Sequence, residues 1–152
     1  MRTQKQINAL IEKYQGLLEY YLWNGNPHDT WEFLVEDLTQ RYPDIDILGV
    51  CVHYPKIVCM DIHLMRHATL QVIEDCVKHE IAHAELPYGY GHGVRWKSIY
   101  KHLAGNMSKA QQKHFFFYGF KRWVDQGRGD EVVGTVCYDE LSGVLSNYAP
   151  LN

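Results

Sequence analysis

The run His79-Glu80-Ile81-Ala82-His83 is the strongest chemical signal in this sequence, and it has the pattern H-E-x-x-H. Two histidines four residues apart lie on one face of a helix, about 6 Å from each other, so both imidazoles can reach one metal ion. Glu80 follows the first histidine and is rotated from it by about 100° around the helix, which directs its carboxylate towards water on that ion. Zinc lowers the pKa of such a water to about 7, and the carboxylate can then accept its proton.

His92 is the candidate for a third metal ligand. Pro87 must end the helix soon after His83, and the turn Tyr88-Gly89-Tyr90-Gly91 lets the chain fold back. Three protein ligands leave one zinc position for water, which is the catalytic arrangement. Glu85 is a weaker candidate because it lies two residues beyond His83, on the opposite face of the helix. A capping or exposed histidine is the alternative interpretation of His92.

Four further residues are weaker candidates for the site. Tyr88 and Tyr90 in the turn are candidates for an oxyanion or substrate contact, with packing as the alternative. Asp61 and His63 share one face of an expected strand and are candidates for the wall of a cleft. An ordinary polar sheet face is the alternative for these two.

The hydrophobic pattern predicts the elements that position these residues. Apolar side chains that recur every three or four positions predict five helices, at about 4–22, 29–42, 69–86, 94–104 and 108–124. Thr69 is expected to cap the helix that carries H-E-x-x-H. Runs rich in Ile and Val predict strands at 45–53, 57–64 and 132–138, and the first two are expected to form a hairpin or to lie as two adjacent strands. In 57–64, alternate residues from Val58 to Leu64 are expected to face the core.

Length and composition place the chain among globular proteins. Its 152 residues correspond to one domain, and 46% hydrophobic with 22% charged residues excludes disorder and collagen-like repeats. No apolar run reaches the roughly 18 residues of a membrane span, and the polar start predicts a cytoplasmic location. The four cysteines form no C-x-x-C pair, which argues against a zinc ribbon and favours buried free thiols.

The net charge of -3 conceals a basic middle segment. Residues 92–128 hold eight Lys or Arg and one Asp, a balance that suits an anionic partner such as DNA. Arg95, Lys97 and Lys101 are the candidate DNA contacts. Solvated helix faces beside an acidic neighbour are the alternative interpretation. Trp96 and Tyr100 recur at helical spacing and are expected in the core, with stacking on bases as the alternative.

The run from Ile57 to Tyr100 resembles the SprT-like (Spartan-type) zinc metallopeptidase domain. The similar pieces are Met60-Asp61-Ile62-His63-Leu64, the H-E-x-x-H helix, and His92-Gly93-Val94-Arg95-Trp96-Lys97, which is similar to the family's H-G-x-x-W/F-K. The resemblance implies an α+β, zincin-like fold, in which a small antiparallel or mixed sheet packs on the active-site helix with additional helices. It also implies that His79, His83 and His92 bind Zn²⁺, that Glu80 is the general base, and that the activity is proteolysis.

Two departures from the family bear on the DNA-crosslinked proteins that some members cleave. Many bacterial members carry a cysteine-rich zinc ribbon after the catalytic domain, whereas this chain has no such cysteine pairs. The spacing from His83 to His92 is also short compared with eukaryotic members. We expect one domain over 1–152, with N-terminal helices in 1–42, a catalytic core in 45–104, and a C-terminal helix and strand in 105–152.

Three hypotheses about function follow. The leading one is a zinc metalloendopeptidase that cleaves proteins or peptides, with DNA-associated proteins as candidate substrates. The second is a zinc hydrolase that acts on nucleic acid. The third is a non-catalytic, zinc-stabilised module that binds DNA or a partner, which would require a closed site with four ligands. The sequence offers three well-placed ligands, which favours the catalytic interpretation.

Overall fold

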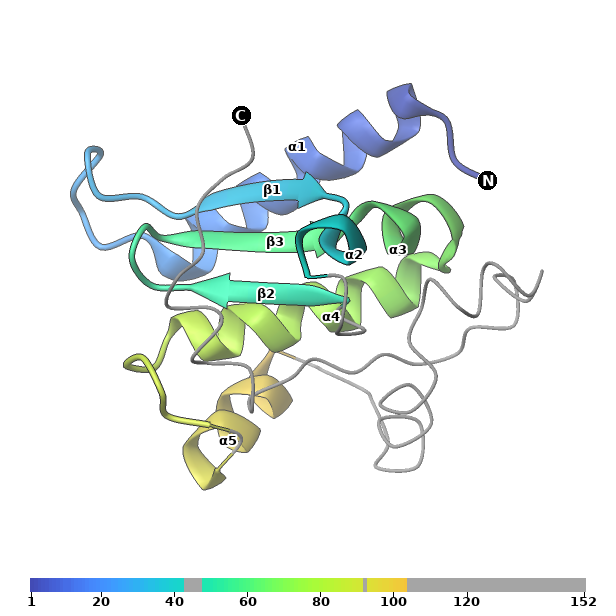
Figure 1. Cartoon of the computed structure of the whole chain (residues 1–152). Coiled ribbons are helices and arrows are strands. Elements are labelled where there is room, and N and C mark those ends of the chain that lie inside the picture. The colour runs from blue at the N-terminus through green and yellow to red at the C-terminus, as the bar shows by residue number, and fades with distance from the viewer. Residues whose placement is uncertain (43–47, 92, 104–152) are drawn as a thin grey trace.

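A computed structural model describes residues 1–42, 48–91 and 93–103 of the chain. Within these ranges the chain is α+β, with one three-stranded sheet and five helices (Figure 1). The helix predicted at 108–124, the strand predicted at 132–138 and the candidate ligand His92 lie outside the described residues.

The sheet is mixed and has the strand order β1-β3-β2. β1 (Glu32–Glu36) runs parallel to the central strand β3 (Ile57–Asp61), while β2 (Gly49–Val52) runs antiparallel to it. Val58 of β3 lies between Phe33 of β1 and Cys51 of β2. The predicted hairpin is therefore confirmed as the pair β2 and β3, and the mixed sheet agrees with the expected fold class.

Two helices, α1 (Gln4–Leu22) and α4 (Leu70–Ala84), cover one face of the sheet (Figure 1). They form the larger hydrophobic core with that face, and Tyr14 and Leu18 of α1 are fully buried in it. The Thr69 side chain accepts a hydrogen bond of 3.3 Å from the backbone of the first turn of α4, as the sequence predicts. Both covering helices begin and end within about two residues of their predicted bounds.

A smaller hydrophobic core covers the other face of the sheet at α2 (Leu38–Arg41). Leu38 of α2 packs there with alternate strand residues, namely Val50, Val52, Ile57 and Cys59. Every residue of β3 is buried as a result. The prediction of a single core-facing side for this strand is therefore wrong, because α2 encloses the face that was expected to be polar.

The helix predicted at 29–42 is wrong over residues 32–36, which form β1. Trp31, Leu34, Val35 and Leu38 do recur at helical spacing. However, the aromatic and branched side chains of this segment also suit a strand, and pairing with β3 satisfies its backbone groups. Phe33 and Leu34 consequently face opposite cores, which is the period of a strand.

The strand predicted at 57–64 ends early, because the chain turns into helix α3 (Ile62–His67). The Asp61 side chain starts this helix by accepting a hydrogen bond of 3.1 Å from the backbone N–H of His63. The helix predicted at 94–104 is confirmed as α5 (Val94–His102), which packs against α4 on the side away from the sheet (Figure 1).

Gln15 of α1 covers the outer edge of β1 with two hydrogen bonds. Its side-chain Nε2 donates to the Trp31 carbonyl at 3.0 Å, and its Oε1 accepts from the Phe33 N–H at 2.8 Å. These are bonds that a neighbouring strand would otherwise make. Within the described ranges, β2 forms the opposite edge of the sheet and lies beside α4.

Two predictions from composition concern the described residues. Cys51, Cys59 and Cys76 are buried thiols that form no disulfide, as expected, while Cys137 lies outside the described residues. None of the helices in the described part of the chain is long and apolar enough to cross a membrane.

Candidate metal centre

His79 and His83 on α4 point their rings at a common place. Their ring centroids are 5.0 Å apart, and their Nε2 atoms are separated by 3.2 Å. Zinc binds imidazole nitrogen at 2.0–2.1 Å, so tetrahedral ligation of one ion requires two nitrogens on the order of 3.4 Å apart. The observed separation fits that requirement. It also fits a hydrogen bond in which one neutral ring donates to the other.

Aromatic side chains of α5 cover this histidine pair. The Trp96 ring lies 4.5 Å from His79 and 5.5 Å from His83, measured between ring centroids. The indole N–H also donates to the His79 carbonyl at 3.3 Å, and Tyr100 stacks on Trp96 at 4.9 Å. Both aromatic residues are buried, so their expected place in the core is confirmed.

Glu80 is buried beside the pair and faces the sheet. Its side chain is 2% exposed. Burial raises the pKa of the Cys51 thiol on β2 well above its usual range, and the charge of Glu80 adds to that rise. The carboxylate therefore lies on the side of α4 that faces the edge strand. A buried carboxylate next to two convergent imidazoles is the arrangement that the H-E-x-x-H spacing predicts.

Asp75 is a second buried carboxylate on α4, one turn before His79. Its Oδ1 accepts a hydrogen bond of 3.1 Å from Gln71 Nε2. Asp75 and Glu80 place two acidic groups in the part of the helix that carries the histidines. Acidic groups in low dielectric favour a nearby cation.

The other candidate site residues lie around the end of α4 and on α5. The Tyr90 hydroxyl accepts a hydrogen bond of 3.3 Å from Arg95, whose guanidinium lies over the Tyr90 ring, while Tyr88 packs on His53. Arg95, Lys97 and Lys101 are all exposed. The described part of the chain thus gathers His79, His83 and Glu80, and leaves the three basic residues at the surface.

A separate group of possible metal ligands consists of Asp37, Asp61 and His63. Each offers one ligand atom, and the three atoms lie within 4.8 Å of one another, so this group could hold a metal ion. His63 Nε2 is 3.5 Å from Asp37 Oδ2. The same carboxylates also cap helices, since Asp37 accepts from Gln40 N and Asp61 from the N–H groups of Leu38 and His63.

Asp61 and His63 are site candidates from the sequence, whereas Asp37 is not. Asp37 falls inside the helix predicted at 29–42, but in the structure it directly follows β1. The parallel pairing of β1 with β3 aligns Glu36 with Asp61 and so brings Asp37 to His63. The signal that could have revealed this is the acidic residue placed at the end of each of the two strands.

Asp61 provides a prediction about the pH dependence of stability. Burial raises its pKa from 3.8 to about 6, so the folded chain holds this proton more tightly than the unfolded chain does. The stabilisation is complete below pH about 4 and is lost as pH rises through about 6, with a total of about 3 kcal/mol. We expect Asp61→Asn to remove this dependence. Urea unfolding in the presence of a chelator measures the free energy of unfolding of both proteins. Between pH 4 and 7.5 this free energy should rise in the variant relative to the unchanged chain, and an equal pH dependence in both proteins would contradict the prediction.

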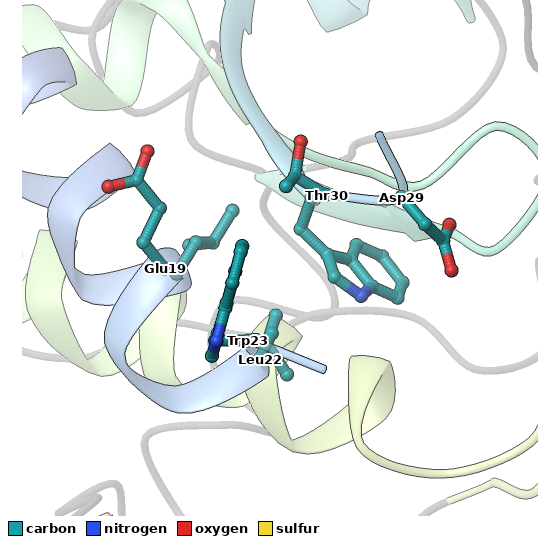
Figure 2. A pocket seen from close by; sticks show the side chains of 7 residues that line it. Glu19, Leu22, Trp23, Asp29 and Thr30 are labelled. Carbon is teal, nitrogen blue, oxygen red and sulfur yellow. The ribbon is translucent and has the colours of Figure 1, made fainter. Parts of the chain in front are cut away.

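A small pocket lies between the end of α1 and the loop before β1 (Figure 2). Its lining is mainly apolar and consists of Leu18, Glu19, Leu22, Trp23, Asp29, Thr30 and Trp31. Trp31 also packs edge-on against His53, at 5.6 Å between ring centroids. The pocket therefore borders the residues that support the end of α4.

Comparisons with models of protein families, with curated proteins and with solved structures find no match for this chain. The resemblance to the SprT-like domain therefore stays a prediction that depends on the sequence motifs.

Proposed function

We propose that this chain is a zinc metalloendopeptidase of the SprT-like type. The observation that carries the proposal is the 3.2 Å separation of the His79 and His83 Nε2 atoms on a helix whose next residue, Glu80, is a buried carboxylate. His92 is proposed as the third ligand on the basis of the sequence. Three neutral imidazoles that leave the fourth coordination position of the ion open are a donor set typical of catalytic zinc.

The proposed chemistry divides between the ion and the chain. When bound, zinc would polarise the scissile carbonyl and the attacking water. Glu80 accepts the proton of that water and passes it to the leaving amine. Trp96 and Tyr100 exclude water from one side of the histidine pair, because both aromatic rings are buried against it. Such a dry environment strengthens the electrostatic interactions of Glu80 and the ligands.

Exposed cations on α5 support the DNA part of the proposal. Lys97 and Lys101 lie one turn apart and about 100° around the helix from the buried Trp96 and Tyr100, and Arg95 is exposed on the other flank of that buried face. A helix with one buried aromatic face and one cationic face can pack on the histidine pair and still meet phosphate groups. DNA-associated proteins are therefore the proposed substrates.

Zinc analysis combined with a casein cleavage assay tests the proposed function. The purified full chain is expected to bind zinc and to cleave casein, with activity lost on treatment with 1,10-phenanthroline and restored by added zinc. Single-stranded DNA in the assay is expected to raise the rate if the cations of α5 bring DNA and substrate together.

The alternatives have distinct outcomes in the same experiment. Cleavage of RNA without cleavage of casein would favour a nucleic-acid hydrolase. Zinc binding without cleavage of either would favour a non-catalytic module. Absence of bound zinc and of cleavage would overturn the proposed function.

A further inference from the structure

His53 connects the end of β2 to the end of the ligand helix. Its Nε2 lies 2.7 Å from the Leu86 carbonyl oxygen and 3.2 Å from the His83 carbonyl oxygen. Both partners are acceptors, so Nε2 must carry the proton and donate. A side chain 30 positions away in the sequence thus hydrogen-bonds the backbone of the second ligand histidine.

Both hydrogen bonds of His53 lie at the C-terminal end of α4. The last carbonyls of an α-helix have no partner within the helix, and helix ends fray when nothing else binds them. The His83 carbonyl accepts from the Leu86 N–H at 3.1 Å as well as from His53. His53 therefore closes the turn from His83 to Leu86, immediately before Pro87.

The His53 ring is itself held from two sides. Trp31 packs edge-on against it with 5.6 Å between centroids, and Tyr88 does so at 6.2 Å. Trp31 precedes β1, and Tyr88 belongs to the turn after α4. The ring is thus fixed between the sheet and the segment that follows the ligand helix.

We propose that His53 is a positioning residue that holds His83 in place for metal binding, an inference that rests on the proposed function. His53 acts through the backbone carbonyl of His83. Fixing that carbonyl fixes the last turn of α4, and with it the 3.2 Å between the two ligand nitrogens. Side chains that orient metal ligands in this indirect way typically account for 10- to 100-fold in metal affinity.

Two amide variants separate the hydrogen bond from the polarity of the side chain. Glutamine can bring an N–H to about the place of His Nε2, whereas asparagine is too short to reach it. His53→Gln should therefore keep the zinc affinity of the unchanged chain, and His53→Asn should lose about 10- to 100-fold. Tyr54→Leu, at a neighbouring residue that is 82% exposed, is the control and should bind normally.

Zinc affinity is measured on the full chain by competition with a chromogenic chelator, and circular dichroism checks the fold. Cobalt bound in place of zinc is expected to give an altered visible spectrum in His53→Asn alone. Should that variant fail to fold, His53→Phe replaces it, since phenylalanine keeps a ring between Trp31 and Tyr88 but donates nothing.

The outcomes distinguish this inference from the proposed function. If the unchanged chain binds zinc and His53→Asn, or His53→Phe in its place, binds it equally well, the positioning role is overturned and the proposed function stands. If His53→Gln loses as much affinity as His53→Asn, the ring and not its N–H matters, which also overturns the role. An unchanged chain that binds no zinc overturns both.

Discussion

Glu80→Gln is expected to lower peptide-bond hydrolysis by about 10²- to 10⁴-fold while the chain keeps its zinc. The range is what a positioned general base typically contributes. Glutamine has nearly the same shape as glutamate and fits the same buried site, but its amide cannot take a proton from water. Initial rates of casein cleavage, together with zinc content by elemental analysis, measure the two halves of this prediction.

The control for this substitution is Glu85→Gln at the end of the same helix. Glu85 caps the C-terminus of α4 and is exposed, whereas Glu80 is buried beside the histidines. The same chemical change there should leave both turnover and zinc content unchanged. Full activity of Glu80→Gln would remove the general-base role, and joint loss of activity and zinc would show a role in metal binding.

His83→Ala is expected to lower zinc affinity by more than about 100-fold, which exceeds the usual effect of a residue that only supports a ligand. The substitution removes one of the two convergent nitrogens but leaves the carbonyl that His53 contacts. Alanine is the best helix former and His83 is only half-buried, so α4 should persist. Chelator competition measures the affinity, and casein cleavage should fall with it.

His28→Ala in the exposed loop before β1 is the matched control and should bind zinc normally. This pair also separates the two groups of possible ligands. If His83→Ala retains its zinc and Asp61→Asn loses it, the ion binds at Asp37, Asp61 and His63, and the proposed centre on α4 is wrong.

The helix that carries the centre was predictable because its signals are local. Thr69 caps it, Pro87 follows its end, and the four-residue spacing of the histidines determines which face they share. That spacing places the two imidazoles within reach of each other. No information from distant parts of the chain is needed to predict the face that they share.

The segment before β2 was not predictable in the same way. Residues 32–36 suit a helix and a strand equally by apolar spacing, and only pairing with β3 decides between them. Because of this error, the closeness of Asp37 to Asp61 and His63 at the end of β3 was also missed. The second face of β3 is covered by α2, which follows β1 in the chain and lies within the segment that was predicted as one helix.

His53 was missed for a related reason. Its bonds to the end of α4 join residues about 30 positions apart, and no local pattern marks them. A histidine just after a strand is usually an exposed residue near a turn. This one gains its contacts because β2 packs along α4 and ends beside the C-terminal end of that helix.

The contacts of α1 have a consequence for attempts to shorten this protein. A truncated version that began at β1 would remove Tyr14 and Leu18, leaving Phe33 and Met60 uncovered. It would also remove the two hydrogen bonds that Gln15 makes to the outer edge of β1 and leave that edge exposed. Exposed borders of this kind invite molecules to join side by side into aggregates. The first helix therefore keeps the protein from self-association, and the smallest useful fragment has to include it.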